Sequence, residues 1–148
     1  MFRGRSDQTI DEKGRIIMPA KFREVLSKRQ DPTIMLTNLD MCLIGYPVEE
    51  WAELERKILS RPDTSDTVKN FKRFLIGGVS ECCIDKQGRI LVPPSLKKYA
   101  QLEKNVVIVG LIDHFEIWNA ERFYSIVQQE ESFGQSEELR MFRHDVGL

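Results

Sequence analysis

The sequence predicts an α+β fold, mainly β, in which one structural unit occurs twice in the chain. Residues 10–22 reappear 74 positions later as residues 84–96, and six of the 13 positions are identical. So specific a match indicates a duplicated unit. Each copy contains an Asp-x-x-Gly-Arg turn, then a short apolar segment and a proline. Because half of a 148-residue chain buries little apolar surface alone, we expect the two halves to share a core.

The first half is predicted to form strand, turn, strand, helix, strand, strand and helix. Residues 6–10 alternate weakly and lead into the turn, where Gly14 suits a positive φ and Asp11 can bond to the amides that follow it. Residues 16–18 are apolar, so we expect a short buried strand, and Pro19 fits the first turn of a helix. The later elements are a helix ended by residues 28–32, strands at 33–37 and 42–46, and a helix opened by Pro47.

The second half repeats this order after a polar break at residues 61–66, where we place the join. Its expected elements are a short helix at 68–75, strands at 79–84, 90–92, 106–109 and 115–118, a helix after Pro93 and Pro94, and a last helix with Asn119 as N-cap. The chain therefore divides into a first unit at 5–50, a helical connector at 51–78, a second unit at 79–122 and a C-terminal helix with polar tail at 123–148. The tail could fray, or become ordered on a partner.

Composition excludes several classes of protein. The chain is 41% hydrophobic and 30% charged, which is typical of a soluble globular protein. No apolar run approaches the roughly 20 residues that span a bilayer, and the first residues lack the apolar core of a signal peptide. We therefore expect a cytoplasmic protein without membrane contact. Cys42, Cys82 and Cys83 lack metal-ligand spacing, so we expect reduced thiols packed in strands and no metal site.

Catalytic chemistry has little support in the sequence. The only histidines are His114 and His144, and no hydrolase, phosphate-loop or zinc-protease motif occurs. Asp11 and Asp85 each share a turn with an arginine, which is better explained by turn formation and an internal ion pair. We predict that the protein is not an enzyme, and no cofactor or small-molecule ligand is indicated.

The distribution of charge points to a nucleic-acid partner although the net charge is −1. Residues 1–29 hold eight Arg or Lys against four Asp or Glu, a net charge of +4, whereas residues 113–148 hold three against eight, a net charge of −5. A small basic cluster is added by Lys69, Lys72 and Arg73. Such sidedness is typical of a protein that places one face on phosphates. Random scatter of surface charge is the alternative.

The arginine of each turn, Arg15 or Arg89, allows two interpretations. It can pair with the aspartate of its own turn inside the fold, which would by itself explain the repeat. It can also project towards nucleic acid beside Lys13 or Lys86, because a guanidinium offers forked donors to phosphate or to a guanine edge. β-Elements are known to enter the major groove. The residues alone leave both interpretations open.

The two turn motifs resemble the MraZ family of bacterial transcriptional regulators, as do the opening at 1–4, Tyr-Pro-x-x-Glu-Trp at 46–51 and Phe-Glu-Ile-Trp at 115–118. The resemblance implies two SpoVT/AbrB-type swapped-hairpin units with a β-barrel character in one chain. This pseudo-dimer, with a pseudo-two-fold axis, would assemble into ring-shaped homo-oligomers. The resemblance also implies binding of double-stranded DNA at repeated promoter sites of the division and cell-wall gene cluster, including the protein's own promoter. Repression and association with the nucleoid are the expected behaviour.

The resemblance places DNA contacts on residues 11–15 and 85–89. The expected DNA-binding residues are all basic: Lys13, Arg15, Lys86, Arg89, Arg3, Arg5, Lys21 and Arg23. The expected turn-stabilising residues are Asp11, Gly14, Asp85 and Gly88. Because Gln87 stands where the first copy has Lys13, and Ser95 where it has Lys21, we expect the first turn to make the stronger contact.

Two other functional classes are kept as alternatives. One is a protein-interaction module similar to an antitoxin, and the other is an assembly scaffold without a nucleic-acid role. Binding to DNA from upstream of the protein's own gene would distinguish both from a regulator.

Overall fold

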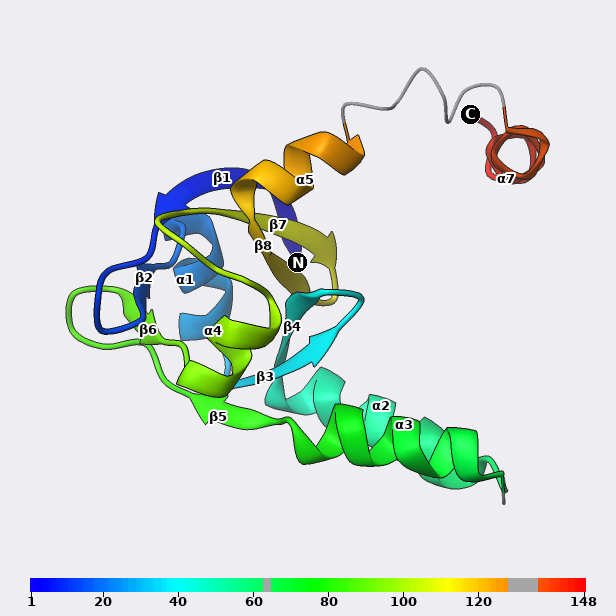
Figure 1. The fold of residues 1–148 in the computed structure, drawn as a ribbon, viewed down its shortest axis with the longest axis horizontal. Helices are drawn as coiled ribbons and strands as arrows, with labels where there is room; N and C mark the ends of the chain where they lie inside the picture. Colours follow the sequence, from blue (N-terminus) through cyan, green and yellow to red (C-terminus); the bar gives the residue numbers. More distant parts are fainter. Residues whose placement is uncertain (63–64, 128–135) are drawn as a thin grey trace.

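The computed structural model describes residues 1–62, 65–127 and 136–148, and the same order of strands and helices occurs in both halves. The elements are β1 (Phe2–Thr9), β2 (Arg15–Ile17), α1 (Ala20–Ser27), β3 (Ile34–Leu39), β4 (Cys42–Pro47), α2 (Val48–Ser60), α3 (Asp66–Gly77), β5 (Ser80–Cys82), β6 (Arg89–Leu91), α4 (Pro94–Tyr99), β7 (Asn105–Ile112), β8 (Phe115–Asn119), α5 (Ala120–Val127) and α7 (Glu137–Asp145). The order β-β-α-β-β-α thus appears twice, with α3 between the copies (Figure 1). The predicted α+β fold with a duplicated unit is confirmed.

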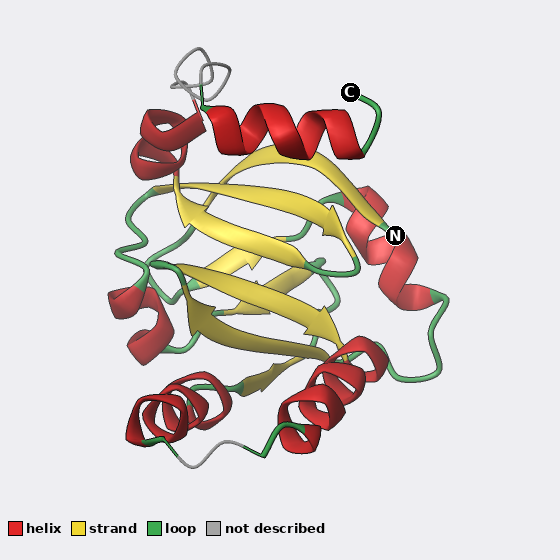
Figure 2. Ribbon diagram, turned by 90° about the vertical axis from the view of Figure 1, so that its right-hand side faces the viewer, coloured by secondary structure: helices red, strands yellow, loops and turns green. Residues whose placement is uncertain are grey.

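The two halves exchange strands within one antiparallel sheet. Its order is β1-β7-β8-β4-β3-β5, and β2 and β6 form a second, two-stranded sheet. The first strand of each unit pairs with the third strand of the other, β1 with β7 and β5 with β3, while β4 and β8 join the units at the centre. Figure 2 shows the strands at the middle of the molecule with helices around them. This exchange gives the expected pseudo-two-fold arrangement, whereas closure into a barrel stays a prediction.

The core is built from both units. Phe2 of β1, Phe22 of α1 and Phe115 of β8 are all buried, and their ring centroids lie 5.1 to 5.9 Å apart. A second apolar cluster, which includes Trp51 and Leu75, attaches α2 and α3 to the sheet. Both helices extend to the side opposite the β2 and β6 turns in Figure 1. Apolar packing thus joins the halves at the same place as the strand exchange.

The exchange explains where the sequence-based strand boundaries were wrong. β1 begins at Phe2 rather than residue 6, because all eight of its residues pair with β7. β7 is longer than the expected 106–109 for the same reason. β5 is shorter than the expected 79–84, since its pairing with β3 ends at Cys82. Pairing with a strand from the other half cannot be read from local sequence.

The C-terminal tail contains a helix. The side chain of Ser136 accepts a hydrogen bond from the amide of Leu139 and caps α7, none of whose residues is buried. Residues 63 and 64 of the predicted join and residues 128–135 of the tail lie outside the described part of the chain. The predicted divisions at residues 51 and 123 fall inside α2 and α5, and the assignment of these segments as separate parts stays a prediction.

The cysteines follow the expectation in two of three cases. Cys42 and Cys82 are buried in strands, and burial raises the pKa of both thiols, that of Cys82 to about 11. Cys83 is exposed, because it follows the last paired residue of β5. The expectation of a third buried thiol was therefore wrong.

The central strand β4 provides a test of the shared core. A Cβ atom at Gly45 would lie 2.4 Å from the ring of Phe115, which belongs to the other half. We expect Gly45→Ala to lower the free energy of unfolding by about 1–3 kcal/mol, as other overpacked cores do. Chemical denaturation measures this change.

Gly77→Ala is the matched control for this substitution. In the described part of the chain, nothing beyond the neighbouring residues and the helix's own backbone comes within 4 Å of a Cβ built at Gly77, at the end of α3. Its stability should be unchanged or slightly higher. Equal midpoints for the Gly45 variant and the wild type would contradict the described packing of β4 on β8.

Candidate nucleic-acid interface

The first turn is closed by its own backbone. The amide of Asp11 donates to the carbonyl of Arg15 at 3.0 Å, and the amide of Gly14 donates to the carbonyl of Asp11 at 3.0 Å. Gly14 has a φ of +86°, a left-handed conformation that favours glycine. A Cβ there would also lie 2.8 Å from the carbonyl oxygen of Val92. Conformation and space therefore both require glycine at this position.

The carboxylate of Asp11 connects the backbone of the turn to its arginine. Oδ1 accepts from the amides of Lys13 and Arg15 at 3.0 and 2.9 Å, and Oδ2 accepts from Arg15 Nε at 2.6 Å. The hydrogen bond from the Arg15 amide is the main cause that lowers the pKa of Asp11. A carboxylate bonded in this way stays charged and restrains the turn.

The second turn repeats this geometry. Asp85 Oδ1 accepts from the amides of Gln87 and Arg89 at 2.9 and 2.8 Å, and Oδ2 accepts from Arg89 Nε at 3.0 Å. The amide of Arg89 is again the main cause of the lowered pKa of Asp85. Gly88, with a φ of +79°, occupies the place of the first glycine.

The two turns are joined to each other. β2 and β6 pair antiparallel with Ile16 opposite Ile90, and both of these side chains are fully buried. Just outside this pairing, the amide of Val92 donates to the Gly14 carbonyl at 2.8 Å and the amide of Met18 donates to the Gly88 carbonyl at 2.9 Å. Two segments far apart in sequence thus lie side by side at one end of the molecule (Figure 1).

Each arginine uses only part of its guanidinium for the ion pair. The side chain of Arg15 is 32% exposed and binds Asp11 through Nε. Among the described residues, no acceptor is bonded to its two terminal nitrogens. Arg89 also donates from Nη2 to Gln87 at 3.3 Å, and its side chain is 25% exposed. The two interpretations of these arginines are therefore compatible, because a turn-forming arginine keeps donors for a ligand.

A third arginine joins the turns from α1. Arg23 Nε donates to the carbonyl of Met18 at 3.2 Å, and its guanidinium lies over Gly88, 2.9 Å from a Cβ built there. Lys13 and Lys86 are exposed on the turns themselves. The residues that the structure brings together here form what we call the turn cluster: Lys13, Arg15, Arg23, Lys86 and Arg89.

The remaining expected DNA-binding residues lie elsewhere. Arg3, Arg5 and Lys21 line a groove between β1 and α1. Arg5 also lies 5.9 Å from the ring centroid of Phe123 in α5. The first residues of β1 are in the middle of the molecule in Figure 1, away from the turns. The structure therefore groups these three residues in a groove, and the start of β1 lies apart from the turns.

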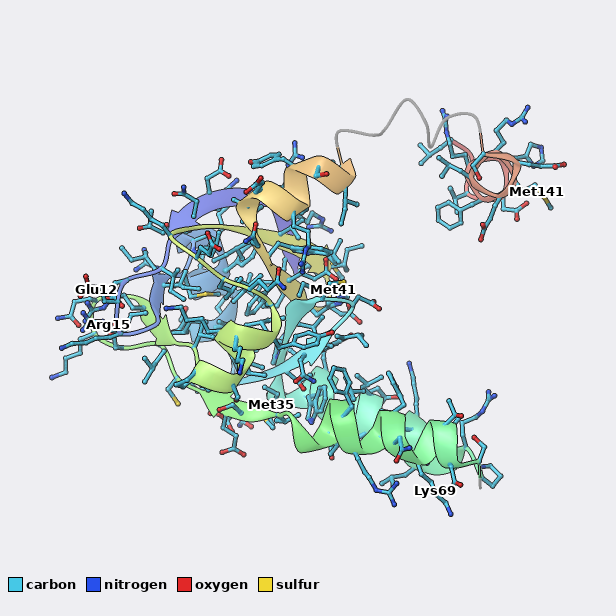
Figure 3. The ribbon with its side chains drawn as sticks, in the orientation of Figure 1. Glu12, Arg15, Met35, Met41, Lys69 and Met141 are labelled. Atoms are coloured by element: carbon cyan, nitrogen blue, oxygen red, sulfur yellow. The ribbon has the colours of Figure 1, made fainter. Side chains whose placement is uncertain are left out.

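The basic cluster of α3 is also remote from the turns. Figure 3 shows Glu12 and Arg15 at one end of the molecule and Lys69 at the other. The uneven distribution of charge along the sequence therefore does not produce one continuous basic face. It is the pairing of β2 with β6 that concentrates positive charge.

Two exposed residues beside the turn cluster were missed by the sequence analysis. Ile17 and Leu91 are 50% and 57% exposed, although residues 16–18 were expected to be a buried strand. The strand alternates, so that Ile16 and Met18 face the core while Ile17 faces outward. This period of two was the signal that could have found them.

The described residues contain no group of three or more His, Cys, Asp and Glu placed to hold a metal ion. None of the described helices is long and apolar enough to cross a membrane. The chemistry that the turn cluster offers is binding of anions by cationic donors.

The lowered pKa of each turn aspartate predicts a dependence of stability on pH. The folded pKa lies below the ordinary value of 3.8, so the stabilising contribution is complete above that value and is lost as the pH falls through the folded pKa. We expect the Asp11→Asn/Asp85→Asn variant to be less stable than the wild type at neutral pH. The difference should shrink as the pH falls below about 4.

Denaturant midpoints of both proteins across this range measure the difference. A gap that is the same at neutral and at acid pH would show that the charge on these carboxylates does not stabilise the turns.

Comparisons with known proteins agree with the duplicated architecture. The family model described as "MraZ protein, putative antitoxin-like" matches twice, over residues 1–74 and 75–144. A protein of Desulforapulum autotrophicum named transcriptional regulator MraZ is 50% identical over 123 residues, which cover 83% of each chain. Proteins of the same name from Halothermothrix orenii and Desulforamulus reducens are 43% and 47% identical, covering 100% and 91% of this chain and 100% and 94% of their own. The chain therefore belongs to the MraZ family.

Proposed function

We propose that this protein regulates transcription by binding double-stranded DNA through the turn cluster. The observation that supports the proposal most is the arrangement of the two turns. They lie side by side, each presents an arginine whose Nε is already held by an aspartate, and lysines flank them. Preorganised guanidinium groups bind phosphates or guanine edges with little loss of conformational entropy.

The regulator is favoured over the two alternatives. Several relatives that match most or all of this chain are named transcriptional regulators. An assembly scaffold would not need free guanidinium donors on paired turns. The antitoxin-like module would need a protein partner, and it is distinguished by co-purification of a foreign protein without DNA binding.

We further propose that the protein acts as a homo-oligomer, in the form of a ring, on repeated sites in DNA. The turn cluster of a single subunit contains five basic residues. Several subunits held together would place many turns along tandem repeats, and the raised effective concentration would convert modest contacts into strong binding. The target in this proposal is the promoter of the division and cell-wall gene cluster, including the protein's own promoter. The outcome would be repression, in the cytoplasm at the nucleoid.

Arg15 is the first residue to test. We expect Arg15→Ala to weaken binding to DNA from upstream of the protein's own gene by about 1–3 kcal/mol per site, because the variant has no bidentate donor at this position. The dependence of affinity on salt should flatten, with a slope smaller by about 1 for each phosphate contact removed. Gel-shift titrations at several salt concentrations measure both effects.

Arg56→Ala removes the same charge from α2, where Arg56 is exposed and pairs with Glu53. Its affinity and salt slope should match those of the wild type. If the folded Arg15→Ala protein bound DNA with wild-type affinity, the first turn would not be part of the DNA interface.

The difference between the two turns is tested by exchanging the residues at equivalent positions. Lys13→Gln gives the first turn the neutral residue of the second, and Gln87→Lys does the reverse. We expect the first change to weaken DNA binding and the second to strengthen it, since Gln87→Lys adds a cation and releases Arg89 Nη2 from its bond. Competition gel shifts on one DNA compare the pair. Equal effects of opposite sign would mean that the turns contribute alike, whereas no effect would exclude both positions from the interface.

A further inference from the structure

The outward face of the β2–β6 ribbon carries two apolar side chains next to its two arginines. Arg15 pairs with Leu91 and Ile17 pairs with Arg89, so each cationic residue is directly opposite an apolar one. Between them, Ile16 and Ile90 point to the core. Ile17 and Leu91 are about half exposed, at 50% and 57%, on the face that also bears the arginines.

We propose that Ile17 and Leu91 contact thymine methyl groups in the major groove and so contribute to the choice of DNA sequence. The inference rests on the proposed function and identifies a part of the base recognition. Among the groups that the base pairs present in the major groove, the C5-methyl of thymine is the apolar one. Aliphatic side chains that flank a groove-binding arginine are therefore suited to thymine, as the arginine is suited to guanine or phosphate.

Charge favours DNA over a second copy of this chain as the partner of this face. Residues directly opposite in an antiparallel pair have Cβ atoms roughly 5 Å apart, so no contact could cover Ile17 without approaching Arg89. Two copies that met through this face would set arginines and lysines against each other. DNA offers phosphates to the cationic side chains and apolar groups on its base edges to Ile17 and Leu91.

The symmetry of the ribbon predicts how the thymines are arranged. The local two-fold axis passes between Ile16 and Ile90, which are directly paired. Ile17 and Leu91 are diagonal neighbours, roughly 7–8 Å apart, which is about two base-pair steps at 3.4 Å each. The thymines should therefore lie on opposite strands, about two steps apart, around a local dyad.

Removal of the methyl group from the DNA tests the proposal without changing the protein. The probe is duplex DNA from upstream of the protein's own gene, prepared once with thymine and once with uracil. We expect the wild type to bind the uracil form more weakly, by about fourfold for each thymine methyl group that Ile17 or Leu91 would otherwise bury. The Ile17→Ser/Leu91→Ser variant should bind the thymine form more weakly and should not distinguish the two forms.

Two further proteins separate this inference from other effects. Leu59→Ser changes a residue of α2 that is 77% exposed, and it should keep the wild-type preference for thymine. Arg15→Ala should weaken binding to both forms and retain their ratio.

Each other outcome would overturn the inference. If the wild type bound both forms equally, contacts with thymine methyl groups would be excluded, although the protein would still bind DNA. If the serine variant still preferred the thymine form, the preference would come from DNA shape rather than from these side chains. If the serine variant changed its oligomer size but kept its preference for thymine, this face would instead be an interface between copies of the chain. No binding to either form would overturn the proposed function as well.

Discussion

The reciprocal hydrogen bonds at Gly14 and Gly88 are the interaction on which the site depends. Each glycine carbonyl accepts an amide from the segment that follows the other unit's turn, at 2.8 and 2.9 Å. β2 and β6 are only three residues long, and a two-stranded ribbon of that length is marginal unless other packing supports it. The exchange of β1 and β5 between units supplies that support, because it fixes the positions from which both turns emerge. The turns are therefore a product of the whole fold rather than of two independent loops.

The same constraint reconciles the structural role of the turn arginines with the DNA-binding role that we propose for them. An arginine bound to aspartate through Nε loses part of its rotamer freedom before any ligand arrives, while its terminal nitrogens take no part in that bond. The entropy cost of ordering the side chain thus falls on folding rather than on binding. In this arrangement the same arginines stabilise the turns and carry the proposed function. A repeated Asp-x-x-Gly-Arg motif is consistent with either demand, and the sequence alone could not decide between them.

Local chemistry was predictable from the sequence, and long-range pairing was not. The glycine and aspartate of each turn and the N-cap at Asn119 follow from rules that involve neighbours along the chain. Pro19 was expected in the first turn of α1 and lies one residue before it, at the N-cap. The extent of β1 and β7 depends on a partner in the other half of the chain, so local alternation underestimated both strands. The grouping of the basic residues in space depends on the same pairing. Arg3 and Arg5 are close to the first turn in sequence but line a groove with Lys21, whereas Arg23 reaches the second turn.

Covalent fusion of the two units allows their turns to diverge. In a dimer of identical chains, a change in one turn would appear in both, and a two-fold site would stay symmetric. Here Lys13 and Gln87 occupy equivalent positions, and the glutamine bonds to the arginine of its own turn. Among the described residues, the second arginine consequently has one fewer free nitrogen than the first, although both aspartates hold their arginines alike. The ribbon thus keeps a symmetric backbone and presents an asymmetric set of donors, so the DNA site that we propose for it would have two unlike halves.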